Sequence, residues 1–126
     1  MDKAQAIHNF WSGFGIHAYD ENTLPSDKNN APEMPYITYS VYEDKIENQI
    51  PLTANLWYRS TKWQEISEKL KEIEEYLYEM DRPIKIDGGY LYLFEGTPFA
   101  QRMSDPSDDM VRRIYINVTA EFLTAY

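Results

Sequence analysis

The sequence predicts a single α+β domain over residues 1–126, in which a mostly antiparallel sheet of about five strands carries two helices on one face. Residues 61–80 place apolar side chains at alternating steps of three and four, the spacing of an amphipathic helix. Several other segments alternate apolar and polar residues, as half-buried strands do. The strands are joined by short links, except where residues 61–80 cross over, and short links favour antiparallel pairing.

The composition fits one packed domain, because 43% of the 126 residues are hydrophobic and 15% are aromatic. The net charge of −9 disfavours binding of a nucleic-acid backbone through a basic groove. The chain has no cysteine, which excludes disulfides and thiolate metal sites. It also has no apolar run near the roughly 20 residues of a membrane helix, and no signal-peptide pattern. These features predict a cytoplasmic protein with no membrane span.

The N-terminal residues 3–14 are predicted to form a short helix that ends at Gly13 and Gly15. Its apolar residues share one face: Ile7, Phe10, Trp11 and Phe14. We expect a brief extended piece over residues 16–19. The following residues 20–35 are polar and rich in proline, which predicts an exposed loop.

Residues 36–43 and 52–59 are predicted to form an antiparallel pair of strands, joined by a charged turn over residues 43–49. Their alternation assigns one set of side chains to the core: Ile37, Tyr39, Val41, Leu52, Ala54, Leu56 and Tyr58.

The helix predicted at residues 61–80 buries one stripe: Trp63, Ile66, Leu70, Ile73, Leu77 and Met80. Thr61 and Gln64 have the spacing of a capping box, and Pro83 marks the end of the helix. The opposite face is charged: Glu65, Glu68, Lys69, Lys71, Glu72, Glu75 and Glu79.

A hairpin is predicted from residues 83–86 and 90–95, because the intervening Asp87-Gly88-Gly89 supplies the glycines of a tight turn. Residues 97–110, which Pro98 and Pro106 interrupt, are interpreted as a second polar loop. The last strand is expected at residues 111–124, with one side facing the core: Ile114, Ile116, Val118, Ala120 and Phe122.

Residue patterns typical of enzymes are missing from the sequence. His8 and His17 lack the spacing of a metal pair, and no phosphate loop, nucleophile elbow or dinucleotide motif occurs. The acidic residues 104–109 do not form a calcium loop, because Pro106 interrupts them and the required glycine and glutamate are missing. We therefore predict no catalytic residue, no metal and no cofactor.

The second face of the predicted sheet collects large aromatic residues: Tyr36, Tyr42, Trp57, Tyr90, Tyr92, Phe94 and Tyr115. A solvent-facing sheet would instead carry small polar and charged residues. Aromatic residues with a polar tip are enriched at protein interfaces, so we predict an assembly surface. The alternative is that the N-terminal helix or a loop covers this face. Phe99, Arg102 and Met103 are predicted to anchor the second polar loop to a neighbouring protein in an assembly.

Three segments carry a family resemblance: residues 56–60 (LWYRS), 96–105 (GTPFAQRMSD) and 112–117 (RRIYIN). Three earlier segments add to it: residues 14–16 (FGI), 18–23 (AYDENT) and 35–39 (PYITY). Taken in the order of the chain, these six segments resemble those of the tail terminator (tail completion) proteins. The resemblance runs over nearly the whole chain. Such proteins are encoded by long-tailed phages and prophages of Gram-positive bacteria.

The resemblance implies a structural virion protein that forms a ring, commonly of six subunits, on the last ring of the tail tube. Such a ring stops tube growth and offers a docking surface to the head connector (stopper) protein, while DNA passes through its lumen. The implied partners are further copies of the chain, the tail tube protein and the head connector. The implied location is the virion tail, and the host cytoplasm during assembly.

Two other interpretations are open from the sequence. A head–tail joining or minor capsid protein would share the interface argument. A small-molecule binding α+β domain would instead use the aromatic face as a pocket, which requires convergent polar groups in an apolar cleft.

Overall fold

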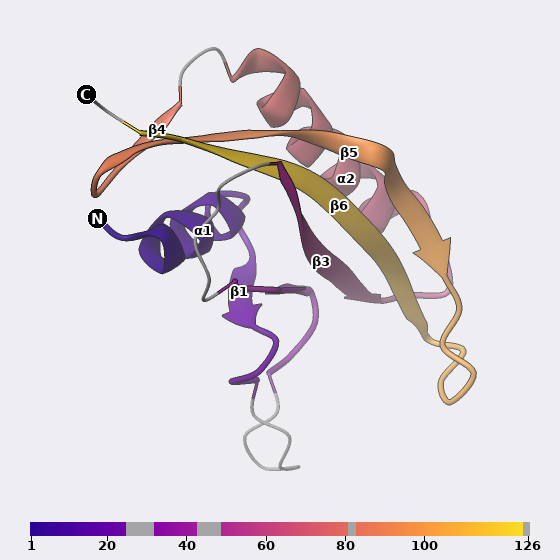
Figure 1. The fold of residues 1–126 in the computed structure, drawn as a ribbon. Helices are drawn as coiled ribbons and strands as arrows, with labels where there is room; N and C mark the ends of the chain where they lie inside the picture. Colours follow the sequence, from indigo (N-terminus) through magenta and orange to yellow (C-terminus); the bar gives the residue numbers. More distant parts are fainter. Residues whose placement is uncertain (25–31, 43–48, 81–82, 125–126) are drawn as a thin grey trace.

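The computed structural model describes residues 1–24, 32–42, 49–80 and 83–124. In this part of the chain two helices and six strands follow one another (Figure 1): α1 (Lys3–Ser12), β1 (His17–Asp20), β2 (Tyr36–Tyr39), β3 (Ile50–Arg59), α2 (Gln64–Glu79), β4 (Ile84–Ile86), β5 (Gly89–Met103) and β6 (Val111–Thr124). The predicted α+β class is confirmed, with one strand more than expected.

The six strands form one sheet in the order β1-β2-β3-β6-β5-β4. All neighbours pair antiparallel except β1 and β2, which are parallel. The additional strand is β1, expected only as an extended piece. Residues 21–35 separate β1 from β2, and a connection of a dozen or more residues is what a parallel pair needs. The confirmed pairs include β2 with β3 and the β4–β5 hairpin, whose Gly88 has a φ of +81°.

The core lies between α2 and the middle of the sheet. Ile66, Ile73 and Leu77 of α2 are buried, while Trp63, Leu70 and Met80 are partly buried against the same cluster, so the predicted stripe is confirmed. The sheet contributes the alternating residues of β3 and β6, which the register places side by side: Leu52 beside Val118, Ala54 beside Ile116 and Leu56 beside Ile114.

The second helix, α1, lies on the same face of the sheet as α2 and buries Ala6, Ile7, Phe10 and Trp11. It contacts both edge strands, β1 and β4. The sheet must therefore curl around the helix, and Figure 1 shows this curvature. The face that carries the helices is concave, and the opposite face is convex.

The predicted helix boundaries need two corrections. The Thr61–Gln64 capping box is wrong: α2 begins at Gln64, and its N-cap is Trp63, which makes no side-chain capping bond. The backbone carbonyl of Thr61 instead accepts a hydrogen bond from Arg112. Helix α1 ends at Ser12, two residues before the predicted end, and Gly15 has a positive φ of 79°.

The predicted polar loop at residues 97–110 is also wrong over its first half. β5 continues to Met103 and pairs with β6 again from Ala100 onward, so only residues 104–110 form the connection. The ladder is irregular between Glu95 and Ala100, where Pro98 lies. Proline has no N–H to donate to the ladder, and it is tolerated at such an interruption.

Strand β2 is shorter than the predicted residues 36–43, because it ends at Tyr39. Beyond it, the Ser40 side chain accepts a hydrogen bond from the backbone N–H of Thr53. Residues 43–48 of the predicted charged turn and residues 25–31 of the first predicted loop lie outside the described residues.

Candidate interaction surface

The convex face of the sheet is the first candidate surface. Both helices pack on the concave face, so among the described elements no helix covers the convex one. The alternative that the N-terminal helix covers the aromatic residues is therefore excluded. The alternative that a loop covers them is excluded only in part, because residues 104–106 of the β5–β6 connection line a pocket with Trp57 and Arg113, and Tyr36 and Thr38 are buried. The strand register places these side chains together on the convex face: Tyr36, Thr38, Asn55, Trp57, Tyr92, Phe94, Tyr115, Asn117 and Thr119.

A row of ring contacts crosses this face from β1 to β6. The ring of Tyr36 lies 5.9 Å from that of Tyr19 and 6.3 Å from that of Trp57, centroid to centroid. The guanidinium of Arg113 lies over Trp57 at 5.2 Å, and the Trp57 indole donates a hydrogen bond of 3.0 Å to the Thr38 hydroxyl. These contacts hold the rings in fixed positions. An aromatic surface that is already ordered loses little side-chain entropy when a partner binds.

Burial, and to a lesser extent the neighbouring Tyr19, raises the pKa of Tyr36, while Arg59 lowers it. The hydroxyl is therefore uncharged at neutral pH and can serve as a hydrogen-bond donor.

Most of the residues predicted for an interface lie on the convex face: Tyr36, Trp57, Tyr90, Tyr92, Met103 and Tyr115. Three do not. Tyr42 lies beyond the end of β2 and is 40% exposed. Phe99 packs against the core, contrary to its predicted role in a loop. Arg102 pairs with Ile114 and so lies on the concave side of the sheet.

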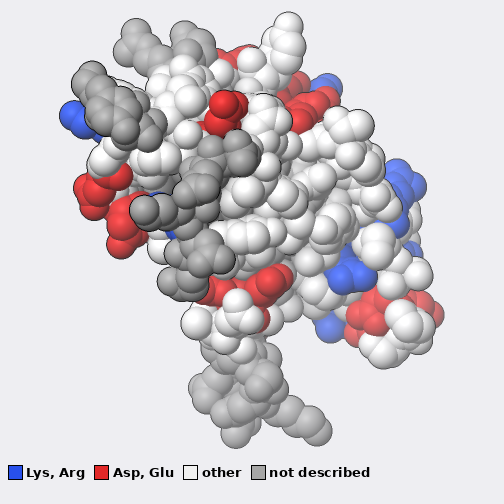
Figure 2. All heavy atoms as spheres, in the orientation of Figure 1, with Lys and Arg blue, Asp and Glu red and all other residues white. Residues whose placement is uncertain are grey.

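All four arginines of the described chain lie at one end of the sheet, which we call the arginine end: Arg59, Arg102, Arg112 and Arg113. Strands β3 and β5 both run antiparallel to β6, so their final residues lie beside its first residues. The topology therefore gathers arginines that are far apart in the sequence. Figure 2 shows Lys and Arg side chains gathered on the side of the molecule where the connection between β5 and β6 lies.

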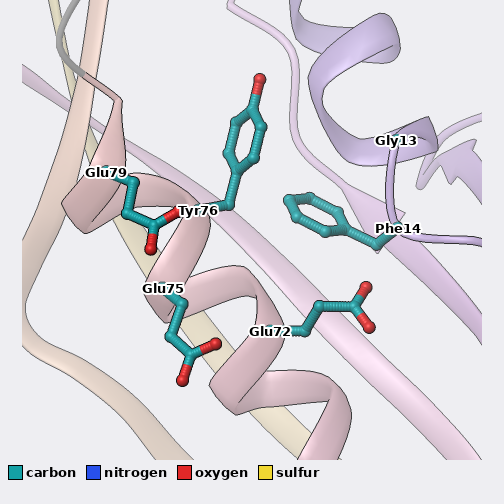
Figure 3. A pocket seen from close by; sticks show the side chains of 6 residues that line it. All are labelled: Gly13, Phe14, Glu72, Glu75, Tyr76 and Glu79. Carbon is teal, nitrogen blue, oxygen red and sulfur yellow. The ribbon is translucent and has the colours of Figure 1, made fainter.

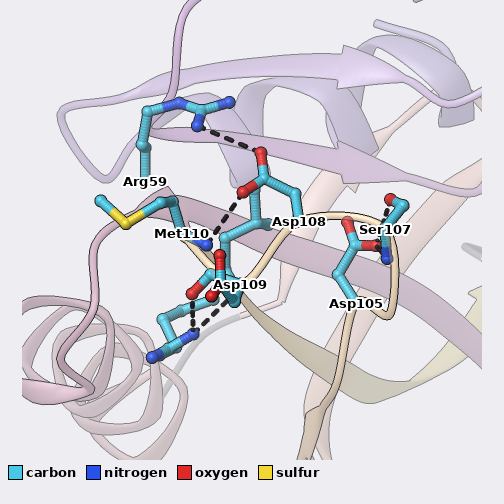
Figure 4. Close-up of polar contacts among 8 residues, drawn as sticks. Arg59, Asp105, Ser107, Asp108, Asp109 and Met110 are labelled. Atoms are coloured by element: carbon cyan, nitrogen blue, oxygen red, sulfur yellow. Dashed lines mark hydrogen bonds and ion pairs between the residues drawn. The ribbon is translucent and has the colours of Figure 1, made fainter.

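The arginines differ in their partners. Arg112 is structural, because it donates hydrogen bonds to the backbone carbonyls of Thr61 at 2.7 Å and of Asp109 at 2.9 Å. Arg59 forms an ion pair of 3.2 Å with Asp108 (Figure 4). Arg102 is exposed, and its guanidinium lies 4.6 Å from the centre of the Trp63 ring. Within the described residues Arg102 forms no ion pair.

The acidic residues of the 104–110 connection stabilise its turns. Asp105 accepts hydrogen bonds from the Ser107 backbone N–H at 3.0 Å and from the Ser107 hydroxyl at 2.6 Å, as Figure 4 shows. These two bonds, and more weakly the charge of Arg113, lower the pKa of Asp105. Asp108 accepts from the backbone N–H of Met110 as well as from Arg59. No group of three or more potential metal ligands occurs among the described residues.

The second candidate surface is the outward face of α2. A pocket of about 270 Å³ lies between this helix and the end of α1 (Figure 3). Three carboxylates and an exposed tyrosine line it, together with Gly13 and Phe14. The acidic residues on this face were predicted, but only as a solvated surface.

The two histidines are placed differently. His8 lies 2.7 Å from the Tyr39 hydroxyl through Nδ1 and 3.2 Å from the Ser12 hydroxyl through Nε2. Its contacts therefore connect α1 to the sheet. The ring of His17 lies 6.2 Å from that of Tyr19.

Sequence reasoning missed Arg59, Arg112 and Arg113 as a group, because only the strand register brings them together. It also missed Tyr76 and Tyr78, although both lie off the apolar stripe of α2, and two large aromatic residues on the polar side of a helix were a detectable signal.

No protein-family model matches this chain, and no curated protein matches it significantly. None of the helices in the described ranges is both long and apolar enough to span a membrane.

Proposed function

We propose that this chain is a structural virion protein of the tail terminator type. It forms a ring of subunits, six by the family resemblance, on the end of a phage tail tube. The ring ends tube growth and presents a surface to the head connector. The observation that carries the proposal is the convex sheet face, whose fixed aromatic side chains no described helix covers.

The chemistry of that face supports a protein partner. Tyrosine and tryptophan bury a large apolar area and still offer a polar group, and interfaces are enriched in both. On the convex face these residues come from five of the six strands, so the surface is broad. A broad face of this kind fits another protein better than it fits a small molecule.

The charge of the chain also suits this role. A net charge of −9 repels a phosphate backbone, so DNA would pass through an acidic ring without adhering to it. The acidic turn residues and His8 have structural partners within the fold. The proposal therefore assigns these residues a role in stabilising the fold.

The proposal predicts that the purified chain forms a closed oligomer and limits the length of tail tubes assembled from the tube protein of the same phage. Tyr92→Lys should abolish tube capping, because it introduces a charge between Tyr90 and Phe94 on the convex face. Ala4→Lys, at an exposed position of α1, is the matched control and should cap tubes normally. Sedimentation velocity measures the oligomer, and electron microscopy measures the tube lengths.

Thermal unfolding establishes that both variants are folded before capping is compared. A wild-type chain that stays monomeric at every concentration and leaves tube length unchanged would contradict the proposed function. Normal capping by folded Tyr92→Lys would show that the convex face is not the assembly surface.

A further inference from the structure

We propose that copies of this chain join head to tail, with Arg102 of one copy seated in the acidic pocket on α2 of the next. This inference rests on the proposed ring and identifies the two surfaces that make the contact between its subunits.

The outward face of α2 combines acidic and aromatic side chains. Helical spacing places four carboxylates on one side of the helix: Glu68, Glu72, Glu75 and Glu79. Tyr76 and Tyr78 flank this stripe with exposed fractions of 51% and 89%, the two highest among the large hydrophobic residues of the described chain. The Tyr76 ring packs partly against Phe10 and Phe14, whereas Tyr78 projects into the solvent. Carboxylates and aromatic rings together are the groups that bind a guanidinium.

The pocket at the C-terminal half of this face is suited to hold such a group (Figure 3). The ring of Tyr76 is held edge-on to Phe14 at 5.5 Å and is tilted against Phe10 at 5.9 Å. Glu72, Glu75 and Glu79 project from α2 around the same hollow of about 270 Å³.

The lysines of this face neutralise the pocket only in part. Lys69 lies 3.2 Å from the Glu72 carboxylate, but it also donates a hydrogen bond of 2.6 Å to the carbonyl of Phe14. The Lys71 ammonium lies 4.0 Å from the Glu75 carboxylate, so this ion pair is long and weak. Glu79 has no ion pair within the described residues. The pocket therefore retains negative charge for a cation to neutralise.

Arg102 is the complementary group. Its guanidinium stacks on Trp63, which leaves the N–H donors at the rim of the plane free to form paired hydrogen bonds with a carboxylate. The stacking also restricts the side chain before it binds, which reduces the entropy lost in the contact. Arg59 is paired with Asp108, whereas Arg102 forms no ion pair within the described residues, so Arg102 is the cation of the arginine end that can neutralise an acidic surface of another copy.

The positions of the two groups require the contact to be between copies. Trp63, beneath Arg102, is the N-cap of α2, whereas Tyr76 lies in its last turns. A rise of 1.5 Å per residue separates them by about 20 Å along the helix, beyond the reach of an arginine side chain. The two patches are different, so the contact is heterologous, and repeating it generates a ring when the rotation closes.

Charge reversal on each side tests the inference. Arg102→Glu replaces the cation of the contact with a carboxylate. Glu75→Lys combined with Glu79→Lys replaces two carboxylates of the pocket with positively charged side chains. Each variant alone should self-associate at least about tenfold more weakly than the wild type, because it places like charges opposite each other. An equimolar mixture of the two variants should recover the wild-type oligomer, with the two kinds of subunit alternating. Sedimentation velocity of the full-length chains measures both results.

Two control variants change the same charges outside the contact. Lys62→Glu alters the arginine end, and Glu74→Lys alters another side of α2; both positions are exposed. Both should associate like the wild type, and thermal unfolding confirms that every variant is folded.

The outcomes separate this inference from the proposed function. If the reversal variants still form the wild-type oligomer and cap tubes, the head-to-tail contact is wrong and the proposed function stands. If they form the oligomer but no longer cap tubes, Arg102 and the pocket face the tail tube, which also overturns the inference. A wild-type chain that never associates overturns both.

Discussion

At the scale of single residues, Gly96 shows how closely the convex face is packed. A Cβ added at Gly96 would lie 2.6 Å from the backbone oxygen of Asn117 and 2.7 Å from its side-chain Cγ. Gly96 lies at the irregularity of β5, where the strand passes tightly over β6. A backbone atom cannot move aside as a flexible side chain can, so this position needs glycine for space.

Gly96→Ala is therefore expected to lower the free energy of unfolding by about 1–3 kcal/mol, as overpacking does. Gly13→Ala is the matched control. Its Cβ would approach the nearest atom, the Phe10 carbonyl oxygen, only to 3.4 Å, and its φ of −82° suits any residue. Alanine there should stabilise the chain by about 0.4–1 kcal/mol. Urea unfolding measures both, and equal effects would contradict the packing argument.

The residues of the candidate surface were predictable only where alternation decides their direction. Tyr36, Trp57 and Tyr115 lie on the predicted face because side chains in a strand point alternately to its two sides. Arg102 and Phe99 were assigned to a loop, and their true positions depend on the pairing of β5 with β6. That pairing joins distant segments, and no local pattern reports it.

At the scale of elements, α2 was the most predictable part of the chain. Its stripe of apolar residues faces the sheet as the spacing required, with Ile66 and Ile73 fully buried. The first residue of the helix was not predictable from the capping-box motif. The N-cap is Trp63, and the backbone carbonyl of Thr61 accepts a hydrogen bond from Arg112. Tertiary packing thus determines where the helix begins.

Ile73→Ala should lower the stability by about 2–5 kcal/mol, because it leaves a cavity between α2 and the sheet. The neighbouring Glu74→Ala should change stability by less than about 0.5 kcal/mol, since Glu74 is exposed. Chemical denaturation of the two variants provides the comparison. Similar losses at both positions would mean that the helix face is assigned incorrectly.

Strand β5 was the least predictable element, because its second half resembles a loop in composition. Gly96 and Pro98 disfavour regular pairing, yet Val111–Thr124 offers a long edge with which Ala100–Met103 can pair. The gain from pairing along β6 exceeds the local preference for a turn.

At the scale of the whole molecule, buried tyrosines couple stability to alkaline pH. Burial raises the pKa of Tyr36, Tyr39 and Tyr58 above the ordinary value of 10.0. For Tyr58 the carboxylates of Glu65, Glu72 and Glu68 on α2 add to the effect. The folded state thus keeps these protons at a pH where the unfolded chain releases them.

The stabilising contribution of these tyrosines is present in full below pH 10 and is lost as the pH rises through the higher pKa values of the folded state. We expect the melting temperature to fall steeply above pH 10, and Tyr58→Phe to reduce that fall, because phenylalanine has no proton to lose. Calorimetry between pH 8 and 11.5, with tyrosinate absorbance alongside, measures this. If the melting temperature of Tyr58→Phe fell with pH in parallel with that of the wild type, Tyr58 would not contribute to the loss of stability at alkaline pH.

The order of the strands has a consequence for synthesis of the protein. β6 is the sixth strand along the chain, yet it lies in the interior of the sheet between β3 and β5. Before residues 111–124 emerge from the ribosome, no strand pairing joins β1-β2-β3 to β4-β5. These partial sheets expose unpaired edges that other nascent chains can join. The chain therefore depends on its final strand to fold, and shortening that strand should leave aggregates instead of a smaller folded domain.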